Sequence, residues 1–487
     1  MEELVLTIEK TNIEYGLKTV LDIDQLRVYQ NERIGIIGDN GSGKSTLLKA
    51  IVGEMLVGKG KITRQIEFSY LEQICLNEQK KIDENAELFS KLGVPSNSYK
   101  EMSGGEQAKY RLATMLSNYH EGMILDEPTT HLDEHSIQFL IDELRFYYGT
   151  LIFVSHDRYF LNELATKIWE ISGGKITEYH GNYESYKKQK EQENIEQQRT
   201  YQQVENEKKR LEKAIVEREK QAQKLIINSK KKSQKQKKPS RLSGTKQKDS
   251  VQKSIQKNVK TMEKRLSKLD SVSEINRQSS ISFPIHQFKE LHNPYPIRGE
   301  AVTISQGKCL LDKTDFQFEK GKKIAIVGSN GVGKTSFLKA ILDGNRGIIT
   351  SSKAIISTFY QQSYQENHES SVLSYLIKQS NYEEKIVRSI LNKLGFTQEE
   401  LQTSFNQLSG GERTRVGLAL TMLRPSNVLI LDEPTNFIDL KTIEALEDLI
   451  RNYPGMVIVV SHDRYFVNQV ADQIYEIKDK QLIRISG

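Results

Sequence analysis

The chain has few cysteines and no long apolar run. Of its 487 residues two are cysteine. Cys75 and Cys309 lie far apart, and neither has neighbours at metal-ligand spacing, so we expect two reduced thiols rather than a disulfide or a cysteine-based metal centre. No segment approaches the roughly 18 apolar residues that span a membrane, and the start MEELVLTIEK does not resemble a secretory signal. We therefore expect a cytoplasmic protein without a membrane domain.

An excess of charge of one sign is also missing from most of the chain. The formal net charge is +6. The segment from Lys220 to Lys260 holds 14 Lys or Arg residues and one acid, Asp249, which gives it a charge of +13 and leaves −7 for the rest of the chain. Such an uneven distribution favours a polyanionic partner that this segment contacts.

What the chain does have is two sets of four motifs in the same order. The first set is GDNGSGKST (38–46), SGGEQ (103–107), ILDEPTTHLD (124–133) and VSHDRYF (154–160), and the second is GSNGVGKTS (328–336), SGGER (409–413), ILDEPTNFID (430–439) and VSHDRYF (460–466). The last three motifs recur after 306 residues but the glycine-rich motif after 290, so the second copy holds 16 more residues between its first two motifs. This pattern indicates a duplicated domain.

Each copy alternates short apolar strands with helical patterns, which predicts an α/β fold with a largely parallel sheet covered on both faces. We expect two tandem phosphate-loop ATPase domains, at residues 1–182 and 281–487, joined by an antiparallel α-helical hairpin linker at residues 183–280.

The linker is predicted from two thin apolar stripes on either side of a break at Lys230–Gly244. Coiled-coil packing of such stripes indicates a helical hairpin with a basic tip. The alternative, a disordered charged linker, fits residues 229–248 but not the periodic flanks. The stripes consist of Tyr201, Val204, Leu211, Ile215, Ala222 and Leu225, and of Val251, Ile255, Val259, Met262, Leu266 and Leu269.

The glycine-rich motifs match the pattern G-x-x-x-x-G-K-[ST] after a strand and before a helix. In this pattern backbone N–H groups and the lysine bind phosphates, and the hydroxyl binds Mg²⁺. One match could be chance, but two in the same context favour two nucleotide sites. We expect ATP binding at Gly38, Asn40, Gly41, Gly43, Lys44, Ser45 and Thr46, and at Gly328, Asn330, Gly331, Gly333, Lys334, Thr335 and Ser336.

Acidic residues end the buried strand of each third motif. Asp126 and Asp432 are placed to hold Mg²⁺ together with Ser45 and Thr335, and the glutamates that follow them to activate water. A single histidine after a strand is more often structural, but the same context in both copies favours contact with the γ-phosphate. The catalytic candidates are Glu127, Glu433, His156 and His462.

With its SGGE motifs the chain resembles the ATP-binding cassette (ABC) superfamily. The resemblance implies a head-to-tail arrangement in which each ATP also meets the signature of the other cassette, at Ser409, Gly410 and Gly411 or at Ser103, Gly104 and Gly105. It implies that Gln73 and Gln361, with Gln362 as an alternative, sense the γ-phosphate and the metal. Tyr15 matches the aromatic residue that stacks on adenine, whereas Ser305 occupies that position in the second copy. Phe437 stands where family members commonly have histidine.

Tandem cassettes around a charged helical hairpin resemble the ABC-F family, whose members bind the 70S ribosome. The resemblance implies that ATP closes the cassettes, that the protein enters the exit site, and that the linker reaches the P-site tRNA and the large-subunit rRNA. Gln73 and Ser103 are only 30 residues apart, so the arm of housekeeping members does not fit. RNA contacts are expected from the tip residues Lys230, Lys231, Lys232, Lys235, Lys237, Lys238, Arg241, Leu242 and Lys246.

An armless form with a long tip resembles the antibiotic-resistance ribosome-protection group of the Msr, Vga and Lsa types. We therefore expect a monomeric ATPase that displaces drugs from the large subunit. Two alternatives stay open: a housekeeping ABC-F factor acting on stalled ribosomes, and the ATPase subunit of an efflux pump, for which a basic hairpin is unusual.

Overall fold

The computed structural model describes residues 3–15, 18–55, 57–72, 86–95, 98–130, 132–235, 257–262, 264–266, 290–360 and 370–486. The chain forms two compact units. One consists of Met1–Tyr186 and Ser279–Gly487 and holds both predicted cassettes, and the other is Lys187–Gln278. Within the described ranges, no helix is both long and apolar enough to cross a membrane.

The first cassette is built on a six-stranded sheet with the strand order β5-β6-β7-β3-β8-β9. All neighbours pair in parallel except β8 and β9. The strands are β3 (Arg33–Gly38), β5 (Phe68–Leu71), β6 (Gly122–Asp126), β7 (Thr150–Val154), β8 (Lys167–Ser172) and β9 (Lys175–His180). Strands β6 and β7 are buried along their whole length, which explains the apolar runs Met123–Leu125 and Leu151–Val154 within them.

The described residues of the first cassette also form a three-stranded antiparallel sheet and five α-helices. The sheet has the order β2-β1-β4, with β1 (Leu4–Tyr15), β2 (Lys18–Tyr29) and β4 (Lys59–Arg64). The helices are α1 (Lys44–Val52), α2 (Ala86–Lys91), α3 (Gly104–Leu116), α4 (Glu134–Arg145) and α5 (Arg158–Leu164), with a 3₁₀ turn η1 at Tyr99–Glu101.

The second cassette repeats both sheets. The larger has the order β14-β15-β16-β12-β17-β18 and the smaller β11-β10-β13. The strands are β10 (Ile297–Gln306), β11 (Lys308–Phe318), β12 (Lys323–Val327), β13 (Ile348–Thr350), β14 (Ile356–Phe359), β15 (Val428–Asp432), β16 (Met456–Val460), β17 (Gln473–Lys478) and β18 (Gln481–Ser486). Two α/β domains with mainly parallel sheets confirm the predicted fold class.

Four helices of the second cassette match α1, α3, α4 and α5 of the first, namely α8 (Lys334–Asp343), α12 (Gly410–Leu423), α13 (Leu440–Asn452) and α14 (Arg464–Val470). The extra residues between the glycine loop and SGGER form helical structure. Here α9 (Val372–Gln379), α10 (Glu384–Lys393), α11 (Gln398–Gln402) and the 3₁₀ turn η3 (Phe405–Gln407) precede α12, and α9 and α10 pack against it.

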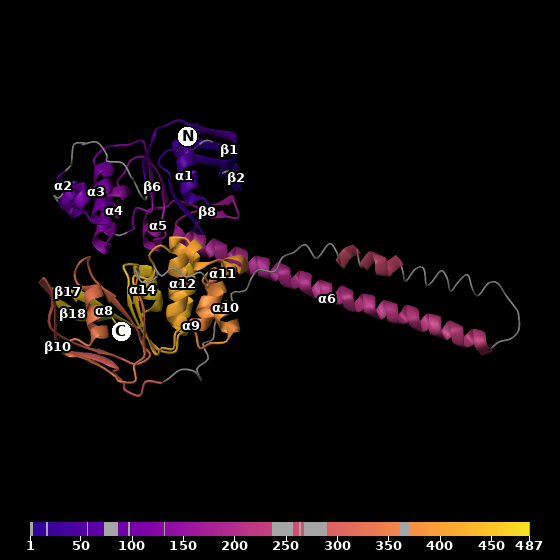
Figure 1. Cartoon of the computed structure of the whole chain (residues 1–487). Helices are drawn as coiled ribbons and strands as arrows, with labels where there is room; N and C mark the ends of the chain where they lie inside the picture. Colours follow the sequence, from indigo (N-terminus) through magenta and orange to yellow (C-terminus); the bar gives the residue numbers. More distant parts are fainter. Residues whose placement is uncertain are drawn as a thin grey trace. The chain divides into compact units, whose positions relative to one another are not determined.

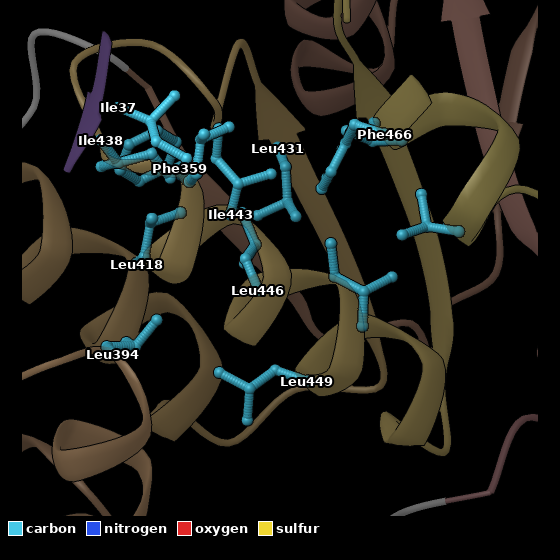
Figure 2. Packing of buried hydrophobic residues seen from close by; sticks show 14 of the residues in the cluster. Ile37, Phe359, Leu394, Leu418, Leu431, Ile438, Ile443, Leu446, Leu449 and Phe466 are labelled. Carbon is cyan, nitrogen blue, oxygen red and sulfur yellow. The ribbon is translucent and has the colours of Figure 1, made fainter. Parts of the chain in front are cut away.

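One cluster of buried apolar side chains includes residues of both cassettes. It holds Ile37 at the end of β3 together with Ile438 and Ile443 from the second cassette (Figure 2). Each cassette also has a separate cluster between its two sheets and its first helix. Shared apolar burial favours the arrangement in which the cassettes face each other.

The order of the sheet brings the motifs of each cassette together. Because β6, β7 and β3 are neighbours and parallel, the motif residues that follow their carboxyl ends lie along one edge. The same holds for β15, β16 and β12. The fold therefore places the glycine loop, the acidic pair and the histidine of each copy side by side.

The second unit begins within α6 (Tyr183–Lys235), a single helix of 53 residues (Figure 1). The apolar stripe of α6 is half-buried at Tyr201, Val204, Leu211 and Ile215. Residues 257–262 and 264–266 are helical, and Arg265 forms a 3.0 Å ion pair with Glu207 of α6, so the returning chain lies along it. This supports the predicted hairpin.

The predicted break at Lys230 was wrong. Helix α6 continues to Lys235, so Lys230, Lys231, Lys232 and Lys235 belong to a helix and not to a loop. The reason is local, since lysine and glutamine are good helix formers and the first proline after the helix is Pro239. The remaining predicted tip residues, Lys237, Lys238, Arg241, Leu242 and Lys246, lie outside the described residues.

Candidate active site

In both copies the glycine loop wraps around its own lysine. Lys44 Nζ donates hydrogen bonds to the carbonyl oxygens of Gly38 at 2.8 Å and Asp39 at 3.1 Å. Lys334 Nζ makes the matching bonds to Gly328 and Ser329, at 2.8 and 3.0 Å. Both lysines are buried. Burial lowers the pKa of both, and the neighbouring glutamate and aspartate carboxylates act in the opposite direction.

Glycine is required where the loop begins and where the helix follows it. Gly38 has φ 157°, and a Cβ there would lie 2.6 Å from the carbonyl oxygen of Ile171. Gly43 has φ 102° and caps α1, and its Cβ would lie 2.7 Å from Val20 Cγ1. Only glycine adopts this path without strain, and the path leaves the N–H groups at the start of α1 open to an anion.

In each cassette, the aspartate that ends β6 or β15 forms a hydrogen bond with a hydroxyl group of the glycine-rich motif. Asp126 bonds the side chain of Ser45, and Asp432 that of Thr335. Burial raises the pKa of both carboxyls. Asp432 Oδ1 is buried and has no hydrogen-bond partner.

This set of oxygens fits Mg²⁺. A carboxylate next to a hydroxyl supplies the hard oxygen ligands that Mg²⁺ prefers, and the ion commonly takes its other ligands from water and substrate phosphates. In the described part of the chain no three His, Cys, Asp or Glu side chains form a metal cluster, so a complete protein cage is not expected there. The residues suited to the ion are Ser45 and Asp126, and Thr335 and Asp432.

The next residue, a glutamate in each copy, has an unusual backbone. Glu127 has φ 52° and Glu433 has φ 50°, in the left-handed region of backbone angles that residues other than glycine seldom adopt. Such strain costs of order 1–3 kcal/mol and is found mainly at functional sites. Its presence in both copies indicates that the direction of the carboxylate matters more than the local strain.

Each glutamate faces the histidine of the fourth motif. Glu127 Oε1 lies 3.2 Å from His156 Nε2, and Glu433 Oε1 lies 3.3 Å from His462 Nε2. Burial raises the pKa of Glu127 to about 7 and that of Glu433 to about 8. It lowers the pKa of His156 to about 3 and that of His462 to about 4, so both imidazoles are neutral at pH 7. A carboxyl that titrates near neutrality is well suited to act as a general base.

The SGGE motifs begin helices α3 and α12 with capping boxes. Ser103 accepts a bond from the backbone N–H of Glu106 and donates its own N–H to the Glu106 carboxylate. Ser409 and Glu412 form the same pair. The serine therefore fixes the first turn of the helix, whose positive end can face a phosphate.

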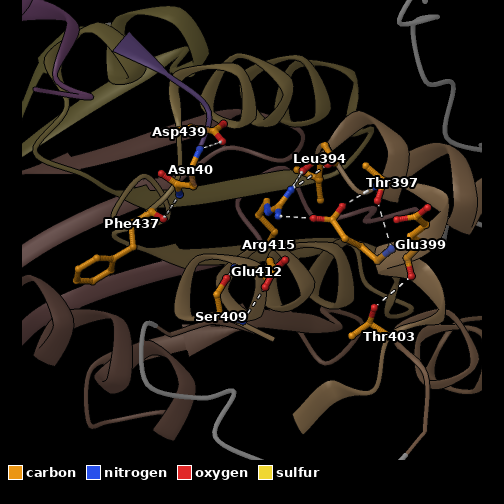
Figure 3. A network of polar contacts seen from close by, with 12 residues as sticks. Asn40, Leu394, Thr397, Glu399, Thr403, Ser409, Glu412, Arg415, Phe437 and Asp439 are labelled. Carbon is orange, nitrogen blue, oxygen red and sulfur yellow. Dashed lines mark hydrogen bonds and ion pairs between the residues drawn. The ribbon is translucent and has the colours of Figure 1, made fainter. Parts of the chain in front are cut away.

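The signature helix of the second cassette lies at the glycine loop of the first (Figure 3). A Cβ on Gly411 would lie 3.1 Å from Asn40 Nδ2 and 3.2 Å from the carbonyl oxygen of Phe437. Asn40 Nδ2 donates to that carbonyl at 3.2 Å, and the backbone N–H of Asn40 donates to Asp439 Oδ2 at 3.2 Å. Phe437, at the position of the expected histidine, thus contacts the glycine loop of the other cassette through its backbone carbonyl.

The glycine loop of the second cassette is contacted in turn by the first cassette. The backbone N–H of Asn330 bonds Asp133, and Asp133 raises the pKa of Lys334 by its charge. One cavity of about 1770 Å³ is lined by both glycine loops, both Glu–His pairs, and signature residues of both cassettes, including Gly105, Ser409 and Gly411. Each site therefore has residues of both cassettes, as the head-to-tail expectation required.

Several residues of the site did not stand out in the sequence. Asp133 and Asp439 each cap a helix and also contact the loop of the other cassette. Their fixed position at the end of the third motif in both copies was the available signal. Asp39 also forms a 2.9 Å ion pair with Lys441, and no such pair can form between the corresponding Ser329 and His135.

Gln306 was missed because one hairpin turn is shorter. Tyr15 pairs with Lys18 in the first cassette and Gln306 with Lys308 in the second, so Gln306, and not the predicted Ser305, matches Tyr15 by register. Gln306 lines the cavity and accepts a 2.9 Å bond from Ser336 Oγ. The side chain of Tyr15 is not among those described.

The two glutamines, Gln73 and Gln361, lie outside the described residues. The strands before them are matched by register, because Leu71 pairs with Leu125 and Phe359 with Leu431. Counted along the chain, each glutamine is the second residue after these strand ends. The register therefore favours Gln361 over Gln362 as the counterpart of Gln73.

Known proteins resemble the chain over its whole length. A family model described as ABC transporter matches residues 21–130 and 311–436, and a second model with that description matches residues 169–253. The erythromycin resistance ATP-binding protein MsrA of Staphylococcus epidermidis is 41% identical over 485 residues, which cover 99% of each chain. The ribosome protection protein VmlR of Bacillus subtilis is 34% identical over 477 residues, covering 95% of this chain and 85% of VmlR.

A solved structure of RNase-L Inhibitor has the same fold. It aligns with a TM-score of 0.65 at 18% identity and covers 98% of this chain and 90% of its own. With two complete sets of motifs facing each other across the cassettes, and with relatives matched from end to end, the chain is an ATP-binding, ATP-hydrolysing member of the ABC superfamily and belongs, with MsrA and VmlR, to the antibiotic-resistance group of the ABC-F family.

Proposed function

We propose that the chain is an ATP-dependent ribosome-protection protein that displaces antibiotics from the large ribosomal subunit. The observation that carries the proposal is the 41% identity to MsrA over 99% of both chains, in a molecule whose cavity is lined by both glycine loops and both Glu–His pairs. In this proposal the protein binds the exit site of the 70S ribosome, and its linker points toward the peptidyl-transferase centre and the P-site tRNA.

The proposed chemistry assigns one task to each motif. The glycine loop and its lysine bind the phosphates, and Glu127 or Glu433 takes a proton from the attacking water. The neutral His156 or His462 holds the glutamate and reaches the γ-phosphate, and the signature helix of the other cassette adds N–H groups. Bound Mg²⁺ would supply positive charge against the phosphate oxygens, held by Asp126 with Ser45 or Asp432 with Thr335. Gln73 and Gln361 are proposed to contact the γ-phosphate and the Mg²⁺.

Hydrolysis and separation of the cassettes are linked in this proposal. Each site needs residues of both cassettes, since Asn40 bonds Asp439 and Gly411 lies next to Asn40. ATP between a loop and a signature helix would therefore hold the cassettes together, and loss of the γ-phosphate would weaken that contact. The ribosome-bound state would last as long as ATP is intact.

The linker is proposed to make the RNA contacts. A helix of 53 residues is about 80 Å long, so α6 can carry its basic end far from its first turn. Lys230, Lys231, Lys232 and Lys235 lie at that end, and Lys237, Lys238, Arg241, Leu242 and Lys246 follow in the sequence. Lysines contribute salt-dependent attraction to rRNA and tRNA phosphates. Leu242 is the proposed apolar contact near the drug pocket.

We further propose a cytoplasmic monomer whose functional parts are residues 1–182, 183–280 and 281–487. Support comes from the pairing of the two cassettes within one chain, which supplies both halves of each site without a second copy.

Drug susceptibility in a heterologous host tests the proposed function. Expression of the chain should raise inhibitory concentrations for at least one of the macrolides, lincosamides, pleuromutilins and streptogramins. A Lys44→Ala, Lys334→Ala variant should give no protection, because neither loop would hold ATP. The protein should sediment with 70S particles when hydrolysis is blocked. No change for any of these drugs, together with ribosome binding and a growth effect, would favour a housekeeping factor, whereas co-purification with a membrane partner would favour efflux.

A further inference from the structure

A buried arginine links the two cassettes next to the histidine of the first. Arg158 is the first residue of α5, two positions after His156, and its side chain is fully buried. Its Nη2 lies 2.7 Å from Oε1 of Glu447, a buried residue of α13 in the second cassette. A buried charged pair between two cassettes needs an explanation, because removing both charges from solvent costs several kcal/mol per ion.

The arginine also contacts rings that lead to the linker. Its guanidinium carbon lies 4.7 Å from the ring centre of Tyr465, at the start of α14. The ring of Tyr465 is in edge contact with that of Tyr183, with centres 6.5 Å apart. Tyr183 is the first residue of α6 and is buried. The arginine, the second cassette and the root of the linker helix therefore meet in one cluster, in which Arg158, Glu447 and Tyr183 are buried and Tyr465 is half-buried.

The root of α6 is fixed to the first cassette by other contacts. Tyr186 packs edge-on against Tyr179 of β9 with ring centres 5.0 Å apart. The carboxamide of Asn182 accepts the backbone N–H of Ser185 at 3.1 Å, and Asn162 of α5 accepts that of Glu184 at 3.2 Å. Tyr183 to Tyr186 belong to the same compact unit as both cassettes. The first turn of α6 is thus bound on one side to α5 and β9, and on the other to Tyr465.

The duplication supplies an internal comparison. Arg464, the counterpart of Arg158, lies 5.6 Å from the ring of Tyr159 and pairs with Glu134 of α4. That pair is exposed, with 48% and 41% of the two side chains accessible, against 0% and 4% for Arg158 and Glu447. Both arginines contact the other cassette, but of the two only Arg158, which lies next to the root of α6, is buried.

The cluster distinguishes facing cassettes from separated ones. If α13 and α14 moved away, Arg158 would lose its contacts with the Glu447 carboxylate and the Tyr465 ring, and Tyr183 would lose its contact with Tyr465. A buried cation without its partner is strongly unfavourable, so the pair must either stay together or become hydrated. A group whose contacts differ between two arrangements biases the equilibrium between them.

We propose that Arg158 is a positioning residue that couples the facing of the two cassettes at the ATP sites to the first turn of the linker helix. When ATP brings the cassettes together, Glu447 and Tyr465 hold Arg158, and Tyr465 completes the pocket of Tyr183. When the cassettes separate, both contacts are lost and the root of α6 becomes freer. The signal to the linker therefore passes through a buried cation and two rings.

Hydrogen exchange of the α6 backbone tests the proposal without a ribosome. In a Glu127→Gln, Glu433→Gln background ATP binds without turnover, and it should slow exchange of peptides that begin α6. Arg158→Met should reduce this ATP-dependent slowing by about tenfold, within the usual range for coupling between sites. Arg464→Met is the matched control and should keep the slowing. Arg158→Lys should restore it in part, because lysine keeps the charge but not the planar ring contact.

Two measurements separate coupling from a folding defect. ATP affinity and the melting temperature without ATP are compared for all variants, and Glu447→Gln, which leaves Arg158 in place, should also reduce the slowing. If Arg158→Met does not fold, Glu447→Gln decides the question. Unchanged ATP-dependent slowing in the folded variants, or an equal loss in Arg464→Met, would overturn the proposal.

Discussion

The backbone N–H of Asn40 donates a hydrogen bond to Oδ2 of Asp439 at 3.2 Å, although the residues are 399 positions apart in the chain. Asp133 bonds the N–H of Asn330 in the same way. Hydrogen bonds hold the pKa of both aspartates below the ordinary value, although burial acts in the opposite direction. Each aspartate is thus an anion that caps its own helix and holds the phosphate loop of the other cassette.

We predict that Asp439→Asn slows ATP hydrolysis at the first glycine loop by about tenfold, the effect of losing one hydrogen bond to a charged group. Asparagine keeps the helix cap, so folding should be spared. Single-turnover hydrolysis with the second loop disabled by Lys334→Ala measures the effect. Lys441→Gln is the control, because its pair with Asp39 is half exposed and should change the rate by less than about threefold. Equal effects of the two substitutions would contradict this role of Asp439.

Hydrolysis should speed up as the pH rises through neutrality. Burial raises the pKa of Glu127 to about 7 and of Glu433 to about 8, so below these values the carboxyls are protonated and cannot accept a proton from water. Above them both are ionised and the base is available. We expect the single-turnover rate at saturating Mg-ATP to increase from about pH 6 to about pH 9. A flat profile in the parent protein would exclude a titrating glutamate as the base.

The two sites should bind ATP with unequal affinity. Tyr15 is the proposed adenine-stacking residue of the first cassette, whereas Gln306 occupies the corresponding place in the second by strand register. Stacking of a base on an aromatic side chain contributes roughly 1–3 kcal/mol in nucleic-acid binders. Calorimetric titration of Lys334→Ala, which leaves the first site, should give tighter binding than Lys44→Ala. Indistinguishable affinities would count against stacking at Tyr15, and Tyr15→Ala should abolish any difference.

The lysines at the end of α6 and Leu242 should contribute to different properties. Replacing Lys230, Lys231 and Lys232 with glutamine should weaken ribosome binding and flatten its salt dependence by about 0.7–0.9 in logarithmic slope per lost phosphate contact. The set of drugs protected against should not change. Leu242→Ala should keep ribosome binding and lower protection for some drugs more than for others.

Ribosome affinity at several salt concentrations, measured beside inhibitory concentrations, checks both halves of this prediction. A lysine variant that binds normally at every salt concentration would contradict the electrostatic role. A uniform loss of protection in Leu242→Ala, in proportion to lost folding, would indicate that Leu242 contributes only to packing.

Much of the fold and of the cassette motifs could be predicted because the information is local. A glycine such as Gly38 is required by its φ angle, and a buried strand such as β16 must be apolar along its length. Because the domain is duplicated, each motif could be seen twice in the same order. The end of α6 was misjudged because a run of lysines was taken as a loop, although charge alone does not end a helix.

The contacts between cassettes could not be predicted, since they depend on how two distant segments meet. Nothing near Arg158 in the sequence indicates that Glu447 is its partner or that it is buried. Gln306 was missed for a different reason, because a turn one residue shorter shifts the pairing of its hairpin. Such shifts become visible only in the strand register.

Cell-free translation separates ribosome protection from drug export, because it contains no membrane across which a drug could be exported. Translation is inhibited with a drug to which the chain gives resistance in cells, and purified protein is then added with ATP. We expect the parent protein to restore synthesis, and the Glu127→Gln, Glu433→Gln variant to bind the ribosome and block it. Resistance in cells without any restoration in the cell-free system would contradict ribosome protection.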